Sequence, residues 1–170
     1  MDKQLAGEEI GGIAALLIGT LKSNSKILAA AESCTAGLAA DLLARVPGAS
    51  QVFWGSFVTY TIDAKAKMLG LDAGMIGRYG AVSRETACAM AKGALLRSGA
   101  DYAFSITGLA GPLGDGTPVK IGTVWIGLIS KGREAAAKEF YFSLSRNELR
   151  LSAANKALEE MLNLVLKENR

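Results

Sequence analysis

The chain has 170 residues, of which 50% are hydrophobic and 21% are charged, and its formal net charge is +3. This length and composition exclude a disordered chain and predict a single globular domain over residues 1–170. The basic residues are scattered, which argues against a nucleic-acid surface, and the absence of histidine excludes the usual Cys/His zinc sites and histidine-based triads.

The termini and cysteines indicate a reducing compartment. The first ten residues contain acids and lack the basic start and apolar core of a signal peptide. The apolar stretch over residues 10–21 is too short to cross a bilayer. Cys34 and Cys88 lie far apart and make no disulfide framework. We therefore expect a cytoplasmic protein with no membrane segment and no membrane partner.

The amino-terminal half alternates predicted helices and strands. Ile10, Ile13, Ala14, Leu17, Ile18 and Leu21 fall on one helical face, and residues 51–62 are rich in aromatic and β-branched side chains. The predicted elements are, in chain order, a helix over residues 10–21, a strand over 26–33, a helix over 34–46, a strand over 51–62, and short helices over 64–69 and 73–78.

The carboxyl-terminal half continues the alternation and then ends differently. Its predicted elements are a helix from Ser83, a strand over 101–107, a glycine-rich loop over 108–118, strands over 121–129 and 135–143 joined at Lys131–Gly132, and a last helix from Ser145. Ser145 and Glu148 have capping-box spacing. Strands separated by helices predict an α/β fold, a three-layer α/β/α sandwich on a mixed, mostly parallel five-stranded sheet, and the terminal strand pair predicts one antiparallel strand.

Ser33 is the first candidate for chemistry, because it stands where a strand leads into a helix. Backbone N–H groups at a helix start can hold the oxyanion of a tetrahedral intermediate. The alternative is that Ser33 or Thr35 only caps the helix. Cys34 competes as a nucleophile, but it has no histidine partner.

Lys65 and Tyr60 are the candidate activating groups for a serine in a chain without histidine. If the sheet is parallel here, the second strand ends on the same edge as Ser33, and ligands of open α/β sheets bind at that edge. A lysine partly removed from water there loses its proton nearer neutral pH and can act as a base. The alternative is an ordinary solvated lysine.

Two further features of this edge favour an anionic ligand. The loop over residues 108–118 has glycines that let the backbone approach a ligand closely, and Thr107 before it offers a hydroxyl. Arg146 and Arg150 lie in the first turns of the last helix, where the macrodipole disfavours cations unless an anion binds. The alternatives are a plain turn and two solvated arginines.

Several linked motifs resemble the CinA C-terminal domain family. They are AESCTAG, the block PGAS…G-x-x-TY-x-x-x-AK, GAVS, SITGLAGP and GTVW, and they cover nearly the whole chain in the family's order. Characterised members of that family are nicotinamide mononucleotide deamidases. The resemblance implies a three-layer α/β/α fold and an amidohydrolase that needs no cofactor and no metal.

The resemblance also implies roles for individual residues. Ser33 becomes the nucleophile, Tyr60 and Lys65 its activating partners, Thr107 an active-site hydroxyl and Arg146 a substrate-binding arginine. The remaining residues expected to contact the substrate are Thr35, Gly37, Gly108, Gly111 and Arg150. The expected mechanism is attack of Ser33 on the carboxamide, with Lys65 as base and the N–H groups of the following helix on the oxyanion.

Two departures from the family pattern and two alternative functions stay open. Ala36 stands where the family has a glycine, and Lys120 is shifted by one position from the family's lysine. The expected partner is the small-molecule substrate, nicotinamide mononucleotide, and a homodimer is possible. The alternatives are a non-catalytic domain that binds a nucleotide and regulates a partner, and an amidase for another small carboxamide.

Overall fold

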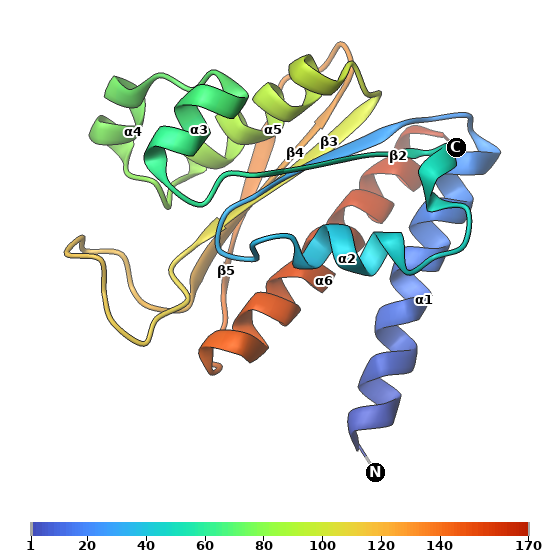
Figure 1. Cartoon of the computed structure of the whole chain (residues 1–170), viewed down its shortest axis with the longest axis horizontal. Coiled ribbons are helices and arrows are strands. Elements are labelled where there is room, and N and C mark those ends of the chain that lie inside the picture. The colour runs from blue at the N-terminus through green and yellow to red at the C-terminus, as the bar shows by residue number, and fades with distance from the viewer. Residues whose placement is uncertain (1, 170) are drawn as a thin grey trace.

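The structure is a computed structural model that describes residues 2–169, with the side chains of residues 2–11 outside the description. Helices and strands alternate in the first part of the chain, and consecutive helices followed by consecutive strands make up most of the rest (Figure 1). In chain order they are α1 (Asp2–Ser23), β1 (Leu28–Glu32), α2 (Leu38–Ala44), the 3-10 turn η1 (Ala49–Gln51), β2 (Phe53–Val58), α3 (Ile62–Leu69), α4 (Ala73–Tyr79), α5 (Arg84–Ser98), β3 (Tyr102–Gly108), β4 (Thr123–Ser130), β5 (Ala136–Tyr141) and α6 (Arg146–Glu168). The predicted α/β class is confirmed.

The five strands found in residues 2–169 form one mixed sheet in the order β2-β1-β3-β4-β5. β1 runs parallel to β2 and β3, whereas β4 runs antiparallel to β3 and β5. With two parallel and two antiparallel pairings, the expectation of a mostly parallel sheet is wrong. The reason is the place of β4: it is the strand that runs opposite to the others, and it lies between two neighbours rather than at an edge.

Helices cover both faces of the sheet (Figure 1). Helices α1, α2 and α6 pack on one face, and α3, α4 and α5 pack on the other. Because successive strand side chains point to opposite faces, Ala30 of β1 joins the first core while Ala29 and Ala31 join the second. These small side chains let helices approach β1 closely from both sides.

The opening helix matches its predicted pattern where its side chains are described. Ala14, Leu17, Ile18 and Leu21 are buried in the core formed with α6. The side chain of Ile10, which we assigned to the same face, lies outside the described residues. The 3.6-residue apolar period therefore explains how α1 packs through its second half.

Two predicted boundaries next to the site are wrong. Strand β2 ends at Val58, not at residue 62, because the side chain of Thr61 caps α3 by accepting a hydrogen bond from the Ala64 N–H (3.1 Å). Helix α2 begins at Leu38 rather than at residue 34, since residues 33–37 form a turn. The functional candidates in both segments therefore lie on short connections rather than inside regular elements.

The predicted capping of the last helix is confirmed. The Glu148 carboxylate accepts a hydrogen bond from the Ser145 N–H at 3.1 Å, as part of a capping box. Glu148 thus places a negative charge at the amino terminus of α6, where the macrodipole favours one. The helix dipole is therefore compensated without a bound anion.

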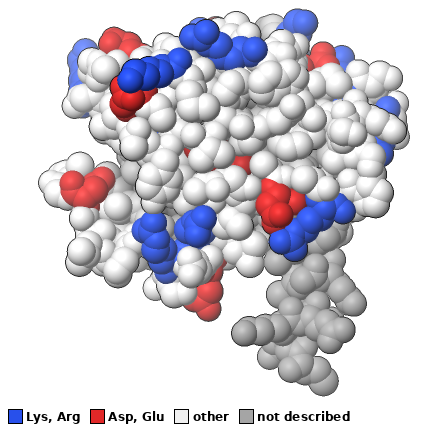
Figure 2. All heavy atoms as spheres, viewed as in Figure 1, with Lys and Arg blue, Asp and Glu red and all other residues white. Residues whose placement is uncertain are grey.

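The charged side chains on the surface and the lengths of the helices bear on the expectations for nucleic acid and membrane. On the face shown in Figure 2, charged side chains lie in small groups around a wide uncharged area, and in several of these groups basic and acidic side chains are adjacent. Within the described part of the chain, no helix combines the length and the apolar character that crossing a membrane requires.

Candidate active site

The carboxyl ends of three neighbouring parallel strands meet at one edge of the sheet. The register pairs Glu32, the last residue of β1, with Val58 of β2 and Ile106 of β3. Ser33 comes next after β1, and the Ser33 N–H donates to the Ile106 carbonyl at 2.9 Å. The expectation that Ser33 and the end of the second strand open on the same edge is therefore confirmed.

Lys65 contacts Ser33 directly. Lys65 lies on α3, its side chain is 1% exposed, and its Nζ is 2.7 Å from Ser33 Oγ. The same Nζ donates to the Thr59 carbonyl at 2.8 Å. Two fixed partners hold the amine in one place, so the reading of Lys65 as a solvated surface lysine is wrong.

The surroundings of Lys65 favour its neutral form. Burial lowers the pKa of Lys65 from its ordinary 10.5 to about 8. Among the described side chains, those of residues 12–169, no carboxylate forms an ion pair with Lys65, which would otherwise hold the proton on the amine. A neutral lysine beside a serine hydroxyl can accept its proton and act as a general base.

Cys34 has the opposite electrostatic situation. Burial raises the pKa of the Cys34 thiol to about 12, so the group stays protonated at neutral pH. A thiolate, not a thiol, is the reactive form of cysteine. Of the two adjacent candidates, the site therefore favours Ser33 as nucleophile.

The turn after Ser33 is held by a carboxylate that the sequence analysis did not single out. Glu32 is fully buried, and its Oε2 accepts from the N–H groups of Gly37 and Ala39, each at 3.0 Å. Its Oε1 accepts from the Ala40 N–H and from Ser56 Oγ, also at 3.0 Å each. The reading of Ser33 or Thr35 as the helix cap is therefore wrong, because Glu32 makes these contacts.

This arrangement changes which N–H groups are available for an oxyanion. The N–H groups at the start of α2 that we assigned to that role already donate to Glu32. Within the described residues, the Cys34 and Thr35 N–H groups have no hydrogen-bond acceptor. The free donors therefore lie in the turn itself, next to Ser33.

Arg150 braces the same turn from the side of α6. Its Nε donates to the Cys34 carbonyl and its Nη2 to the Thr35 carbonyl, both at 3.0 Å. In a trans peptide the C=O and the following N–H point in opposite directions. By holding the Cys34 carbonyl, Arg150 therefore also fixes the direction of the Thr35 N–H.

Arg146 joins three segments at this edge. Its Nη1 donates to the Gly111 carbonyl (2.6 Å) and its Nη2 to Tyr60 Oη (2.7 Å). The start of α6, the connection after β2 and the loop after β3 therefore lie together beside the Ser33 turn, on one side of Figure 1. Among residues 2–169, no hydrogen bond joins Tyr60 to Ser33 or Lys65, so the structure does not bring Tyr60 into that contact.

The remaining predicted residues lie at the edge but are mostly engaged by protein groups. Thr107 is buried, and its hydroxyl donates to the Ala81 carbonyl at 2.7 Å. Gly108 is the last residue of β3, where an added Cβ would lie 2.8 Å from the Thr123 carbonyl oxygen. Thr35 is fully buried, and its hydroxyl lacks a partner among the described residues.

The two departures from the family pattern have different structural consequences. Ala36 adopts a left-handed backbone with φ of 50°, a region that favours glycine. Lys120 is exposed, with its Nζ 4.3 Å from the ring centroid of Tyr141. Ala36 therefore affects the turn that follows Ser33, whereas Lys120 contacts β5.

Sequence reasoning missed Glu32 and the Thr59 carbonyl. An acidic residue a few positions before a helix start is a usable signal for Glu32, because carboxylates favour helix amino termini. No sequence signal identifies the Thr59 carbonyl as the second acceptor of Lys65. That role depends on where β2 ends.

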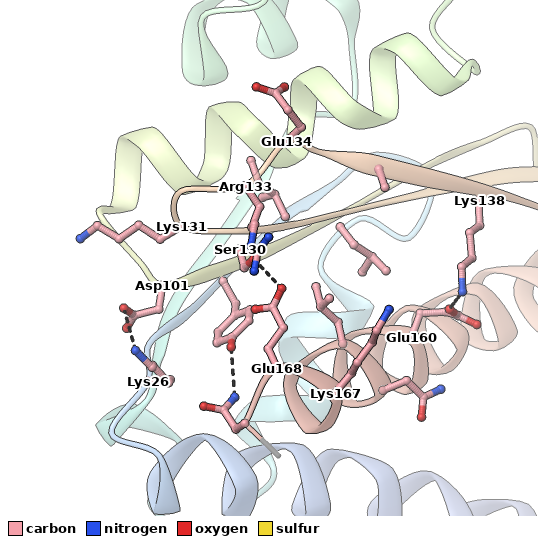
Figure 3. Close-up of a pocket in the computed structure, with 17 residues that line it drawn as sticks. Lys26, Asp101, Ser130, Lys131, Arg133, Glu134, Lys138, Glu160, Lys167 and Glu168 are labelled. Atoms are coloured by element: carbon pink, nitrogen blue, oxygen red, sulfur yellow. Dashed lines mark hydrogen bonds and ion pairs between the residues drawn. The ribbon is translucent and has the colours of Figure 1, made fainter.

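A cavity of about 950 Å³ lies at the opposite end of the strands from Ser33, where Tyr102 begins β3 and Ser130 ends β4. Figure 3 shows charged side chains around it that pair with one another, such as Lys26 with Asp101 at 3.7 Å. Ser130 Oγ donates to Glu168 there at 2.9 Å. Among the side chains that the structure describes, those of residues 12–169, no group of three or more Asp, Glu, Cys or His is close enough to hold a metal ion.

The fold and the site define a class of α/β protein in which a buried lysine contacts a serine at the carboxyl edge of parallel strands. The chain belongs to the CinA family: the CinA C-terminal domain matches residues 11–165. The resemblance inferred from the sequence motifs is therefore confirmed.

Individual relatives agree with this assignment. A CinA-like protein of Akkermansia muciniphila is 45% identical over 141 residues, covering 82% of this chain and 34% of that protein. A CinA-like protein of Myxococcus xanthus is 40% identical over 163 residues, covering 92% of this chain and 38% of that protein. The chain thus spans little more than a third of the length of these relatives.

Solved structures share the fold over nearly the whole chain. The competence/damage inducible protein CihA of Agrobacterium tumefaciens is 38% identical with a TM-score of 0.87, covering 92% of this chain and 94% of that one. A competence-damaged protein (CinA) superfamily protein of Escherichia coli is 32% identical with a TM-score of 0.86, covering 92% and 90%.

Proposed function

We propose that the protein deamidates nicotinamide mononucleotide to nicotinate mononucleotide and ammonia, with Ser33 as nucleophile and Lys65 as base. The observation that carries this proposal is the 2.7 Å contact between Lys65 Nζ and Ser33 Oγ in a buried site. Family membership supports the substrate, because characterised members that resemble this chain act on that nucleotide. The buried amine supports the mechanism, because a domain that only binds a nucleotide needs no such base.

The first half of the proposed reaction forms an acyl-enzyme. Ser33 Oγ gives its proton to neutral Lys65 Nζ and attacks the carboxamide carbon, and the carbonyl oxygen takes the negative charge. We assign the Cys34 and Thr35 N–H groups as donors to that oxyanion, since they lack acceptors among the described residues. The C–N bond then breaks, and ammonia leaves with the proton returned by Lys65.

The second half regenerates the serine. A water molecule gives a proton to Lys65 and attacks the acyl carbon, and the bond to Ser33 Oγ breaks as Lys65 returns that proton to the serine. The net reaction adds one water to the amide and yields the carboxylic acid and ammonia, which at neutral pH are the carboxylate and ammonium. No step requires a metal or a cofactor.

Arg146 is the proposed phosphate-binding residue. Both of its observed acceptors, the Gly111 carbonyl and Tyr60 Oη, are neutral, so its charge has no counterion among the described residues. The guanidinium is also exposed at the same edge as Ser33. Two donors of Arg150 are held by backbone carbonyls, so we assign that residue to bracing the turn.

The test is ammonia release from a small panel: the mononucleotide, its riboside, and a pyridine carboxamide without a sugar. The mononucleotide should be the best substrate. Arg146→Ala should reduce its kcat/KM by about ten- to hundredfold, as expected for one lost charge-assisted hydrogen bond, and leave the riboside nearly unchanged. Arg78→Ala, which removes an arginine stacked on Tyr79, is the matched control.

Each contrary result has a definite meaning. No ammonia from any amide would contradict the enzymatic proposal and favour a binding domain. Preference for another carboxamide would contradict the substrate assignment. Equal losses on nucleotide and riboside in Arg146→Ala would show that Arg146 acts by joining Tyr60 and Gly111, not by binding phosphate.

A further inference from the structure

Glu32 is a fully buried carboxylate without a cationic partner among the described residues. A buried charge of this kind is costly unless hydrogen bonds replace its lost water. Glu32 receives four donors: three N–H groups at the start of α2 and the hydroxyl of Ser56. All four contacts donate to the side chain, so it acts only as an acceptor.

The backbone of Glu32 is fixed at the point where the catalytic segments meet. Its carbonyl accepts the Thr59 N–H at 2.8 Å, and the Thr59 carbonyl in turn accepts Lys65 Nζ at 2.8 Å. The next residue, Ser33, donates its N–H to Ile106. Glu32 is therefore followed directly in the chain by Ser33, and its carbonyl is hydrogen-bonded to Thr59, the residue whose own carbonyl holds Lys65.

The turn that Glu32 holds has an uncommon backbone. Ala36 and Gly37 are consecutive left-handed residues, with φ of 50° and 95°. Such conformations persist only where the surroundings hold them in place. The Glu32 carboxylate binds the Gly37 N–H, and so it closes the turn at the end opposite to Ser33.

We propose that Glu32 is a positioning residue for the Ser33 nucleophile. Its carboxylate takes the N–H groups of α2 and fixes the Ser33–Gly37 turn, which holds Ser33 Oγ against Lys65 Nζ and leaves the Cys34 and Thr35 N–H groups free for the oxyanion. This inference rests on the proposed function through Ser33. It assigns Glu32 no contact with the substrate.

The test is Glu32→Gln in the full chain, with two readouts. One is kcat and KM for ammonia release, and the other is the rate at which a fluorophosphonate labels Ser33, measured by mass spectrometry. The amide presents an NH₂ group to donors that need an acceptor, so kcat and the labelling rate should fall together by about ten- to hundredfold. KM and the midpoint of the pH profile should stay the same, since neither Arg146 nor Lys65 has changed.

Asp72→Asn is the matched control, because Asp72 Oδ1 accepts the Gly74 N–H at 2.9 Å and caps α4 in the same way. It should lower the melting temperature without lowering the labelling rate. If Glu32→Gln behaves like this control, Glu32 serves stability alone and the proposal is overturned.

Two further outcomes keep the test decisive. If Glu32→Gln does not fold, Ser56→Ala removes one donor to the same carboxylate, and it should slow labelling; an unchanged rate would overturn the proposal. If the wild-type protein labels at Ser33 but releases no ammonia, the proposed function fails while the labelling comparison still decides the role of Glu32. A wild-type Ser33 that neither labels nor turns over would overturn both.

Discussion

Lys65 combines a structural disadvantage with a chemical advantage. The residue is 1% exposed, and its amine has two neutral partners, the Ser33 hydroxyl and the Thr59 carbonyl. Burial disfavours the charged amine, so the pKa of Lys65 falls to about 8. The same burial makes Lys65 suited to the role of base that we propose for it, in a chain that has no histidine.

The first prediction concerns the pH dependence of turnover. Lys65 accepts a proton only when it is neutral, and with a pKa of about 8 the neutral fraction rises with pH up to that value. We expect kcat/KM to rise about tenfold per pH unit below pH 8 and to level off above it. A profile that is flat from pH 6 to 9 would contradict Lys65 as the base.

The second prediction concerns stability. The pKa of Lys65 is about 8 in the folded protein, below its ordinary 10.5, so the unfolded chain binds more protons between these values and stability rises with pH there. Below pH 8 the buried amine is charged, and its burial then lowers the free energy of unfolding by the full amount, about 3 kcal/mol. Lys65→Met removes this cost of burying a charge, but it also removes the hydrogen bonds to Ser33 and Thr59. Two hydrogen bonds are worth about 1–3 kcal/mol together, so we expect a net gain of about 0–2 kcal/mol at pH 7, less at pH 10, and no turnover.

Urea denaturation at both pH values measures this effect, with Lys67→Met as the control. Lys67 lies on the same helix but is exposed and paired with Asp63 at 2.9 Å. Its replacement should change stability by less than about 0.5 kcal/mol. A Lys65→Met protein that is less stable than wild type at pH 7 would contradict the account of the buried amine.

At the scale of elements, the connection between β1 and α2 determines where Ser33 lies. It is a turn of residues 33–37 with two left-handed residues, closed by Glu32 and braced by Arg150. The sequence shows a strand running into a helix, which places Ser33 correctly at the junction. It does not show that the helix starts at Leu38, because that depends on the side chain of Glu32 taking the first N–H groups.

The third prediction tests the turn through Ala36. A left-handed alanine costs roughly 1–2 kcal/mol, and glycine relieves this at an entropic cost of roughly 0.5–1 kcal/mol. Ala36→Gly should therefore stabilise the protein by about 0.5 kcal/mol and keep or raise activity. Ala36→Val should lose about 1–3 kcal/mol and most activity, although the position is exposed.

Thermal unfolding and ammonia release of both variants measure this prediction. The exposed position means that valine meets no steric conflict in a core, so the loss would come from the backbone. Equal stability of the glycine and valine variants would show that the turn relaxes away from its left-handed form.

At the scale of the whole molecule, the sequence predicted the order of elements and the edge where the chemistry lies. Alternating periodicities identified the helices and strands, and family motifs placed Ser33 and Lys65 in one site. The antiparallel pairing of β4 with β5 followed from the predicted terminal strand pair, whereas nothing local shows that β4 also pairs with β3 and so lies between the two.

The contacts that the last helix makes with residues remote in sequence could not be predicted from local sequence patterns either. Arg150 reaches the Cys34 carbonyl and Arg146 reaches Tyr60, which are remote in sequence and meet only after α6 packs on the sheet. From the sequence, we took two arginines at the start of a helix as a sign that an anion binds there, because the helix dipole disfavours cations at that end. In the structure, Glu148 already supplies a negative charge at this end. Fold-level packing, not local electrostatics, sets their partners.

Ammonia release from nicotinamide mononucleotide by two neighbouring variants, Ser33→Ala and Cys34→Ala, tests the central claim most directly. Ser33 Oγ contacts the buried amine of Lys65, whereas burial raises the pKa of Cys34 to about 12. We predict that Ser33→Ala folds normally and loses at least about a thousandfold in kcat, while Cys34→Ala keeps most of its activity. An inactive Cys34→Ala beside an active Ser33→Ala would contradict the account.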